Sequence, residues 1–105
     1  MLYIFNKVKD MIDFNKIGFV LASKYRRLIL EALLKRPMTV SEIAEEYGIN
    51  KRSLYGPAKS LRHNGLVFKK ERTYTITEEG AEVINFIHER ASVKYQFPHG
   101  KAPQL

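Results

Sequence analysis

The feature that most constrains this chain is a glycine between two short stretches with apolar residues at helical spacing, 39–47 and 51–64. In the first stretch Thr39 and Glu42 have the spacing of a capping box, which starts a helix. Gly48 then supplies the left-handed turn that ends it. Two helices joined by a turn of three or four residues that contains glycine form a helix-turn-helix. The junction therefore predicts two consecutive helices with a tight turn between them.

The second of these helices contains a local contradiction. Leu54, Ala58 and Leu61 recur at i, i+4 and i+7 and predict one buried face, yet the pair Gly56-Pro57 lies between them. The proline removes the N–H that would bond the Ser53 carbonyl, at a cost of about 3 kcal/mol or more in a straight helix. Three outcomes stay open: a kinked helix that keeps its phase, two helices with the proline starting the second, or a different register.

The residues before this motif predict two more helices. Apolar residues at helical spacing run over 2–14 and, most strongly, over 19–36, which Pro37 ends. Residues 15–18 look like a break between them. No apolar stretch approaches the ~18–20 residues that a membrane span needs. A signal-peptide pattern is also missing, so we expect a cytoplasmic protein without a membrane partner.

The residues after the motif predict a hairpin. The stretches "LVFKK" and "TYTIT" are rich in β-branched and aromatic residues, and Glu71-Arg72 separates them. The caps expected for the helix 51–64 are Asn50 at its start and Gly65 at its end.

The C-terminal part predicts a final helix, 78–95, capped by Thr77. Two prolines and a glycine indicate a flexible tail over 96–105. We therefore expect a mainly α fold with a small β-hairpin, in a single domain over 1–95 whose core covers 19–80.

Positive charge is concentrated in the middle of the chain. The net charge is +7, and residues 48–72 carry 7 basic residues and 1 acidic residue. A concentrated basic block is more typical of a polyanion-binding surface than scattered lysines are. The chain has no cysteine, which excludes disulfides and a cysteine nucleophile. The three histidines, His63, His88 and His99, lack partners at ligand spacing, so we expect no metal and no cofactor. The chain shows no nucleophile elbow, phosphate loop or paired-carboxylate motif, so we expect no enzyme activity.

The stretch "TVSEIAEEYGINKRSLYGPAKSLRHNGLV" resembles the winged helix-turn-helix of prokaryotic transcription regulators of the ArsR and MarR kind. The residues that carry the resemblance are Ile43-Ala44, Gly48-Ile49, Leu54, Leu61 and Gly65-Leu66-Val67. "SKYRRLILEALL" and "YTITEEG" are similar to the first core helix and to the junction after the wing. The resemblance covers about 19–90 and implies a winged helix-turn-helix, with extra N- and C-terminal helices, that binds double-stranded DNA sequence-specifically.

In such regulators the second helix enters the major groove and the wing lies near the backbone or minor groove. With Leu54 turned to the core, Arg52 and Tyr55 point outward near the helix start, where we expect base contacts. Lys59 and Arg62 are expected to contact the DNA backbone. The full set of expected DNA-binding residues is Thr39, Ser41, Lys51, Arg52, Ser53, Tyr55, Lys59, Arg62, His63, Lys69, Lys70 and Arg72.

Two smaller questions stay open at these positions. Thr39 and Ser41 stand where free backbone N–H groups can hold a phosphate, but plain helix capping explains them equally well. Gly56 points outward, and a residue without a side chain allows the backbone to approach DNA closely. Alternatively, Gly56 only relieves strain beside Pro57.

The terminal helices, 2–14 and 78–95, are too apolar to be left exposed. They either cover the domain's own core or form the interface of a homodimer. A two-fold dimer would hold its recognition helices about 34 Å apart on a near-palindromic site. The alternatives to sequence-specific DNA binding are a winged-helix protein-interaction module, which the basic helix face disfavours, and RNA binding, which backbone electrostatics do not separate well. The sequence identifies neither the operator nor an effector.

Overall fold

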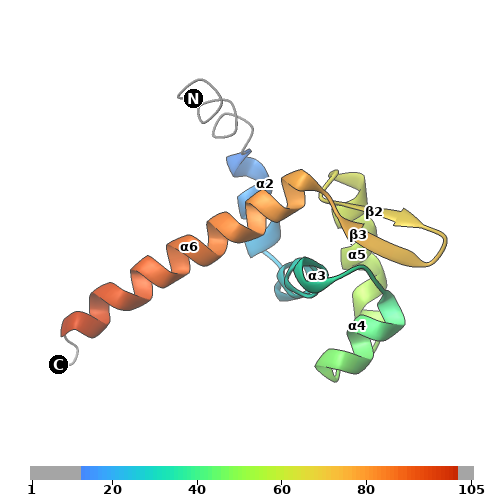
Figure 1. The fold of residues 1–105 in the computed structure, drawn as a ribbon, viewed down its shortest axis with the longest axis horizontal. Helices are drawn as coiled ribbons and strands as arrows, with labels where there is room; N and C mark the ends of the chain where they lie inside the picture. The colour runs from blue at the N-terminus through green and yellow to red at the C-terminus, as the bar shows by residue number, and fades with distance from the viewer. Residues whose placement is uncertain (1–12, 102–105) are drawn as a thin grey trace.

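The computed structural model describes residues 13–101, which form a mainly helical fold with one small sheet (Figure 1). The elements are α2 (Phe14–Leu21), α3 (Lys24–Lys35), β1 (Met38–Thr39), α4 (Val40–Tyr47), α5 (Arg52–His63), β2 (Val67–Lys70), β3 (Thr73–Ile76) and α6 (Glu78–Lys101). A helix-turn-helix followed by a hairpin confirms the expected fold class. Of the helix expected over 2–14, residues up to 12 lie outside the described part of the chain.

The N-terminal helices begin and end at other residues than predicted. Residues 15–18 lie inside α2, so the predicted break there is wrong, and so is a single helix over 19–36. The Asp13 side chain accepts a hydrogen bond from the Asn15 N–H at 2.9 Å and starts α2. The Ser23 hydroxyl accepts one from the Arg26 N–H at 3.3 Å and starts α3. Two N-cap side chains, which the apolar periodicity does not reveal, divide the segment.

The capping box predicted for α4 is present at its first turn. The Thr39 hydroxyl accepts from the Glu42 N–H at 3.1 Å, and the Glu42 carboxylate accepts from the Thr39 N–H at 2.9 Å. At the other end Gly48 has a φ of 65°, and its N–H donates to the last turn of the helix. Both ends of α4 are therefore encoded locally.

A carboxylate near the end of α4 ties this helix to α3. Glu46 accepts from Lys35 Nζ at 2.6 Å and from Arg36 at 3.3 Å. The hydrogen bond from Lys35 is the main reason that the pKa of Glu46 lies below its usual value, and the Glu46 partner in turn raises the pKa of Lys35. The groups are exposed, so the pair orients α4 more than it stabilises it.

Helix α5 runs through Pro57 as one helix, so of the three outcomes the split into two helices is excluded. Leu54, Ala58 and Leu61 are buried, which confirms the predicted register. The N-cap of α5 is Lys51, whose side chain makes no capping bond, so the prediction of Asn50 as the N-cap is wrong by one residue. The Asn50 side chain still accepts a hydrogen bond from the Arg52 N–H at 2.9 Å.

The sheet has three strands in the order β1-β3-β2, all antiparallel. The hairpin β2–β3 was predicted, whereas the two-residue strand β1 was not, because only its pairing with β3 reveals it. Met38 lies opposite Tyr74, and both are buried. Glu71 at the hairpin turn has a φ of 58°, a conformation that side-chain-bearing residues adopt at some cost.

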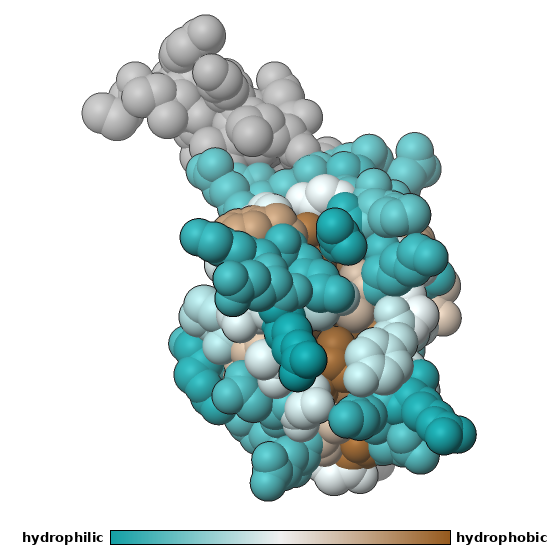
Figure 2. All heavy atoms as spheres, turned by 90° about the vertical axis from the view of Figure 1, so that its right-hand side faces the viewer, coloured by the Kyte–Doolittle hydropathy of each residue, from teal (hydrophilic) through white to brown (hydrophobic). Residues whose placement is uncertain are grey.

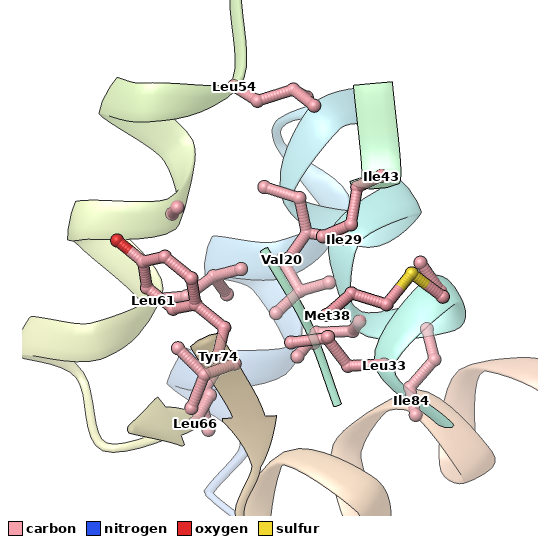
Figure 3. Packing of buried hydrophobic residues seen from close by; sticks show 14 of the residues in the cluster. Val20, Ile29, Leu33, Met38, Ile43, Leu54, Leu61, Leu66, Tyr74 and Ile84 are labelled. Carbon is pink, nitrogen blue, oxygen red and sulfur yellow. The ribbon is translucent and has the colours of Figure 1, made fainter. Parts of the chain in front are cut away.

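The core lies where the helices meet the sheet (Figure 3). Side chains from α2, α3, β1, α4, α5, β3 and α6 and from the turn before β2 converge there. The labelled examples are Val20, Ile29, Leu33, Met38, Ile43, Leu54, Leu61, Leu66, Tyr74 and Ile84. One face of α5 therefore packs against α3, and its opposite face is open to solvent.

The wing, α5 and α6 join at Thr77. Its hydroxyl donates to the Gly65 carbonyl at 2.7 Å and accepts from the Gly80 N–H at 3.0 Å. A Cβ on Gly80 would overlap the Leu66 carbonyl oxygen, so the first turn of α6 needs glycine at this point. The base of the wing is thereby held tightly against the start of α6.

Helix α6 continues to Lys101, past the predicted end at residue 95. The structure thus differs from the expected tail over 96–101, while 102–105 lie outside the described residues. Pro98 lies inside this helix, although proline disfavours a helix interior, and nothing in the structure explains the continuation. Figure 1 shows α6 extending away from the other helices.

Candidate nucleic-acid interface

One side of the molecule carries the start of α4, the outer face of α5 and the wing. Figure 2 views the molecule from that side, and hydrophilic side chains cover most of it with a few hydrophobic atoms visible between them. All twelve predicted DNA-binding residues belong to these elements or to their ends. The fold therefore gathers on one side what the sequence places in separate segments.

The outer face of α5 is basic and open to solvent. Besides Gly56, the exposed residues of this helix and its first turn are Lys51, Arg52, Tyr55, Lys59, Arg62 and His63. Tyr55 is 50% exposed, a large fraction for an aromatic side chain on a helix packed to the core. Ser53 is half-buried. Both predictions of the helical wheel are confirmed, since the apolar face of α5 is buried and its basic face is exposed.

A hollow of about 370 Å³ lies between the start of α4, the start of α5 and the wing. Its lining residues are Thr39, Val40, Ser41, Lys51, Tyr55, Lys69, Arg72 and Tyr74. Three cations and several hydroxyl groups thus face one space without a lining carboxylate. Lys51 Nζ lies 3.5 Å from the Ser41 hydroxyl, which connects α5 to α4 across the hollow.

The hairpin register directs Lys69 into this hollow. Lys69 pairs with Tyr74 on the neighbouring strand, so both side chains lie on the same face of the sheet. The Lys69 ammonium lies 5.5 Å from the centre of the Tyr74 ring, which orients it by a cation–π contact. Lys70 belongs to the opposite face, so it does not line the hollow.

The salt bridges of the described residues lie away from this side. Lys16, Arg27, Lys35 and Arg36 each form a salt bridge with a glutamate, whereas Lys24, Arg26 and Arg90 form none with the described residues. In the part of the chain that the structure describes, no salt bridge involves the basic residues of α5 or the wing. Charge that the fold does not neutralise internally is available to an external polyanion.

The structure also adds residues that sequence reasoning did not select. Val40 and Tyr74 form part of the hollow's wall, and Phe68 on β2 is 50% exposed beside the wing lysines. The alternation of the hairpin contained the signal for Phe68, because Val67 is buried and its neighbour must face the other way. Five predicted residues, Arg52, Ser53, Lys59, Arg62 and His63, lie along α5 outside the hollow, as does Lys70 on the wing.

Other kinds of site are not supported within residues 13–101. No group of three or more histidine or carboxylate side chains is arranged to hold a metal ion among residues 13–90, whose side chains the structure describes. None of the described helices is long and apolar enough to cross a membrane.

A family model supports the reading of the central motif. Residues 23–67 match the model described as bacterial regulatory protein, arsR family. This range runs from the N-cap of α3 to the first residue of β2, so it contains α4 and α5 and reaches the wing. No curated protein matches the chain in sequence.

Solved structures share the fold over most of the chain. Quinone-bound YodB from B. subtilis is 25% identical with a TM-score of 0.70, and the match covers 79% of this chain and 96% of YodB. The transcriptional repressor BigR from Xylella fastidiosa is 18% identical with a TM-score of 0.64, over 90% of this chain and 96% of BigR. The regulator BldR from Sulfolobus solfataricus is 18% identical with a TM-score of 0.65, over 97% and 84%.

Proposed function

We propose that this chain, which is similar to winged helix-turn-helix transcription regulators of the ArsR and MarR kind, binds double-stranded DNA sequence-specifically with α5 in the major groove. The β2–β3 wing then lies on the backbone or in the minor groove. The observation that carries this proposal is the set of exposed cations on α5 and the wing that have no salt-bridge partner among the described residues. Regulators of this kind are generally not enzymes.

The positions of the side chains divide them into residues that contact bases, here called readers, and residues that contact phosphates, here called anchors. Arg52 and Tyr55 lie near the start of α5, where a recognition helix approaches base edges, so we assign them base contacts. Lys59 and Arg62, further along the helix, hold phosphates, and His63 follows them. Ser53, beside Arg52 at the start of the helix, contacts either a base or the backbone. The hollow, with Lys51, Lys69 and Arg72, seats a backbone phosphate beside Thr39 and Ser41, and Lys70 contacts the DNA from the other wing face.

The proposed active form is a homodimer. Two large apolar side chains on α2 are exposed, Phe14 at 69% and Leu21 at 52%. The Phe14 ring packs edge-on against Phe86 of α6 at 5.8 Å, so α2 and α6 present one continuous surface. A second copy of the chain would cover this surface, so that the terminal helices of each single-domain subunit form the dimer interface. The two α5 helices of the dimer would then lie about 34 Å apart. Because the proposed partner is DNA, the protein would act in the cytoplasm.

The experiment that tests the proposal selects bound sequences from random duplexes with the full chain. We expect a near-palindromic site, and affinity for that duplex should fall steeply with salt because phosphate contacts release counterions. Equal affinity for unrelated duplexes, or a preference for RNA or single strands, would overturn sequence-specific DNA binding. Absence of any nucleic-acid binding would favour a protein-interaction module.

Two substitutions separate anchors from readers. Lys69→Ala should weaken binding to all duplexes alike and lower the salt slope by about 1. Arg52→Ala should relax the preference at one position of each half-site, at a cost of about 1–3 kcal/mol. Lys24→Ala is the matched control, because Lys24 is exposed on α3 and lies outside the hollow. An effect of Lys24→Ala as large as that of Lys69→Ala would contradict the assignment of the binding face.

A further inference from the structure

Gly56 occupies the centre of the free face of α5. On a helical wheel it stands within about 20° of the direction opposite Leu54, and it is exposed. Arg52 precedes it by one turn and Lys59 follows it by one turn, so both basic side chains rise beside it. The middle of the basic face is therefore a notch with no side chain of its own.

The packing of the domain does not require glycine in this notch. Gly48 and Gly65 have left-handed backbones, and a Cβ on Gly80 would meet the Leu66 carbonyl. Gly56 shows neither feature, since its φ is not positive and a Cβ built there meets nothing within 4 Å outside its immediate neighbours. Alanine would even favour the helix by about 1 kcal/mol. The one internal reason left is crowding by the ring of Pro57 on the residue before it.

The surface of the notch is apolar. Gly56 lies inside α5, so its N–H and carbonyl are used by the helix, and only its Cα faces outward. The neighbouring cations supply hydrogen-bond donors, whereas the notch supplies none. Among the groups that base pairs present in the major groove, the thymine C5-methyl is the one that matches an apolar contact. The space left by a missing Cβ is about the size of one methyl group.

We propose that Gly56 is a specificity-determining residue, whose notch receives the C5-methyl group of a thymine while Arg52 and Lys59 hold the DNA on both sides. This inference rests on the proposed placement of α5 in the major groove. One base pair in each half-site would then be recognised by the shape of the helix surface at Gly56 and not by a side chain.

The first test changes the DNA and leaves the protein intact. Each thymine of the selected duplex is replaced in turn by deoxyuridine, which lacks only the methyl group, and the dissociation constant is measured. We expect one thymine per half-site at which the replacement weakens binding about fourfold, the effect of one buried methyl-sized group. Equal affinity at every replaced position, or a selected site without thymine under the centre of α5, would overturn the proposal.

The second test fills the notch. Gly56→Ala should weaken binding to the selected duplex about fivefold or more and should abolish the difference between thymine and deoxyuridine at that position. Gly18→Ala is the matched control for the melting comparison only, because Gly18 is also exposed in a helix and a Cβ there also meets nothing within 4 Å, but it lies between Phe14 and Leu21 on the proposed dimer surface. The control for DNA affinity is Lys24→Ala, which lies on α3 outside the hollow. Gly56→Ala protein that keeps both the affinity and the thymine preference of the wild type would refute the role of Gly56.

Thermal melting of the two variants separates this inference from the alternative in which Gly56 only accommodates Pro57. That alternative predicts that Gly56→Ala melts below Gly18→Ala and binds DNA normally once folded. If Gly56→Ala does not fold, the deoxyuridine series on the wild type decides. Failure of the wild type to bind any duplex sinks the proposed function itself, whereas binding without a methyl effect sinks only this inference.

Discussion

The two helices of the helix-turn-helix reach their structure by different means. Helix α4 has a complete capping box at Thr39 and Glu42, a left-handed Gly48 at its end and a salt bridge to α3 through Glu46. Helix α5 has a proline in its interior and relies on its buried residues for its register. Local signals define α4, whereas tertiary packing holds α5.

The difference has a functional side. A helix that reads DNA must leave its outer face free for an external partner, so it cannot use ion pairs or exposed apolar contacts on that face for its own stability. The stability of such a helix then depends on the burial of its inner face. In α5 that inner face consists of Leu54, Ala58 and Leu61, each 1% exposed or less. The stabilities of α4 and α5 are therefore sensitive to different substitutions.

The largest effect is expected for Leu61→Ala, which should lower the free energy of unfolding by about 2–5 kcal/mol through lost burial and a cavity. Leu61 is fully buried, and it holds the second half of α5 beyond Pro57. Urea denaturation followed by circular dichroism measures the change. Leu34→Ala, at a position 36% exposed, is the control and should change little. A loss below about 1 kcal/mol for Leu61→Ala would mean that α5 does not depend on its packing.

The next effect has the opposite sign. Pro57→Ala restores a hydrogen bond to the Ser53 carbonyl and removes crowding, so it should raise the free energy of unfolding by about 2 kcal/mol after allowance for the more flexible unfolded chain. The same denaturation experiment reports it. Unchanged or reduced stability would show that packing of the proline ring outweighs the lost hydrogen bond, and α5 would then resemble α4 in being locally favoured.

A smaller effect is expected at the start of α4. Thr39→Ala removes the N-cap and should cost about 1 kcal/mol, while Thr39→Ser keeps the hydroxyl and should retain most of the stability. The pair also separates the two roles of Thr39, because a phosphate contact would lower DNA affinity in the alanine variant at temperatures where it is fully folded. Equal stability of the alanine and serine variants would contradict local definition of α4.

The smallest effect concerns the pair Lys35–Glu46. Because the pKa of Glu46 is lowered in the folded state, mainly by the hydrogen bond from Lys35, its contribution is present at neutral pH and is lost as the pH falls through that lowered pKa. The raised pKa of Lys35 adds the matching loss at strongly alkaline pH. The difference in melting temperature between wild type and Glu46→Gln should therefore be small at neutral pH and shrink in acid. A difference that grows in acid would contradict the assignment.

The sequence predicts the parts of the fold that rest on local chemistry or on strong periodicity. Thr39, Glu42 and Gly48 bound α4, and the spacing of Leu54 and Leu61 gives the register of α5. Three features depend on more than this. The division between α2 and α3 depends on caps that periodicity hides, β1 exists only through its pairing with β3, and the continuity of α5 through Pro57 depends on burial that opposes local propensity.

The composition of the candidate interface was predictable, but its shape was not. A helical wheel suffices to turn Arg52, Lys59 and Arg62 outward. The convergence of Ser41, Lys51 and Lys69 on one hollow requires the hairpin register and the angle between α4 and α5, which no local pattern contains. The absence of salt bridges to these cations among the described residues is likewise a property of the folded chain.

One hydroxyl group near the end of the wing has a mechanical consequence. The Thr77 hydroxyl hydrogen-bonds both to Gly65, in the turn that follows α5, and to Gly80 in the first turn of α6. Helix α6 has 24 residues and is about 36 Å long. The orientation of this long helix is therefore coupled through one side chain to the turn between α5 and the wing.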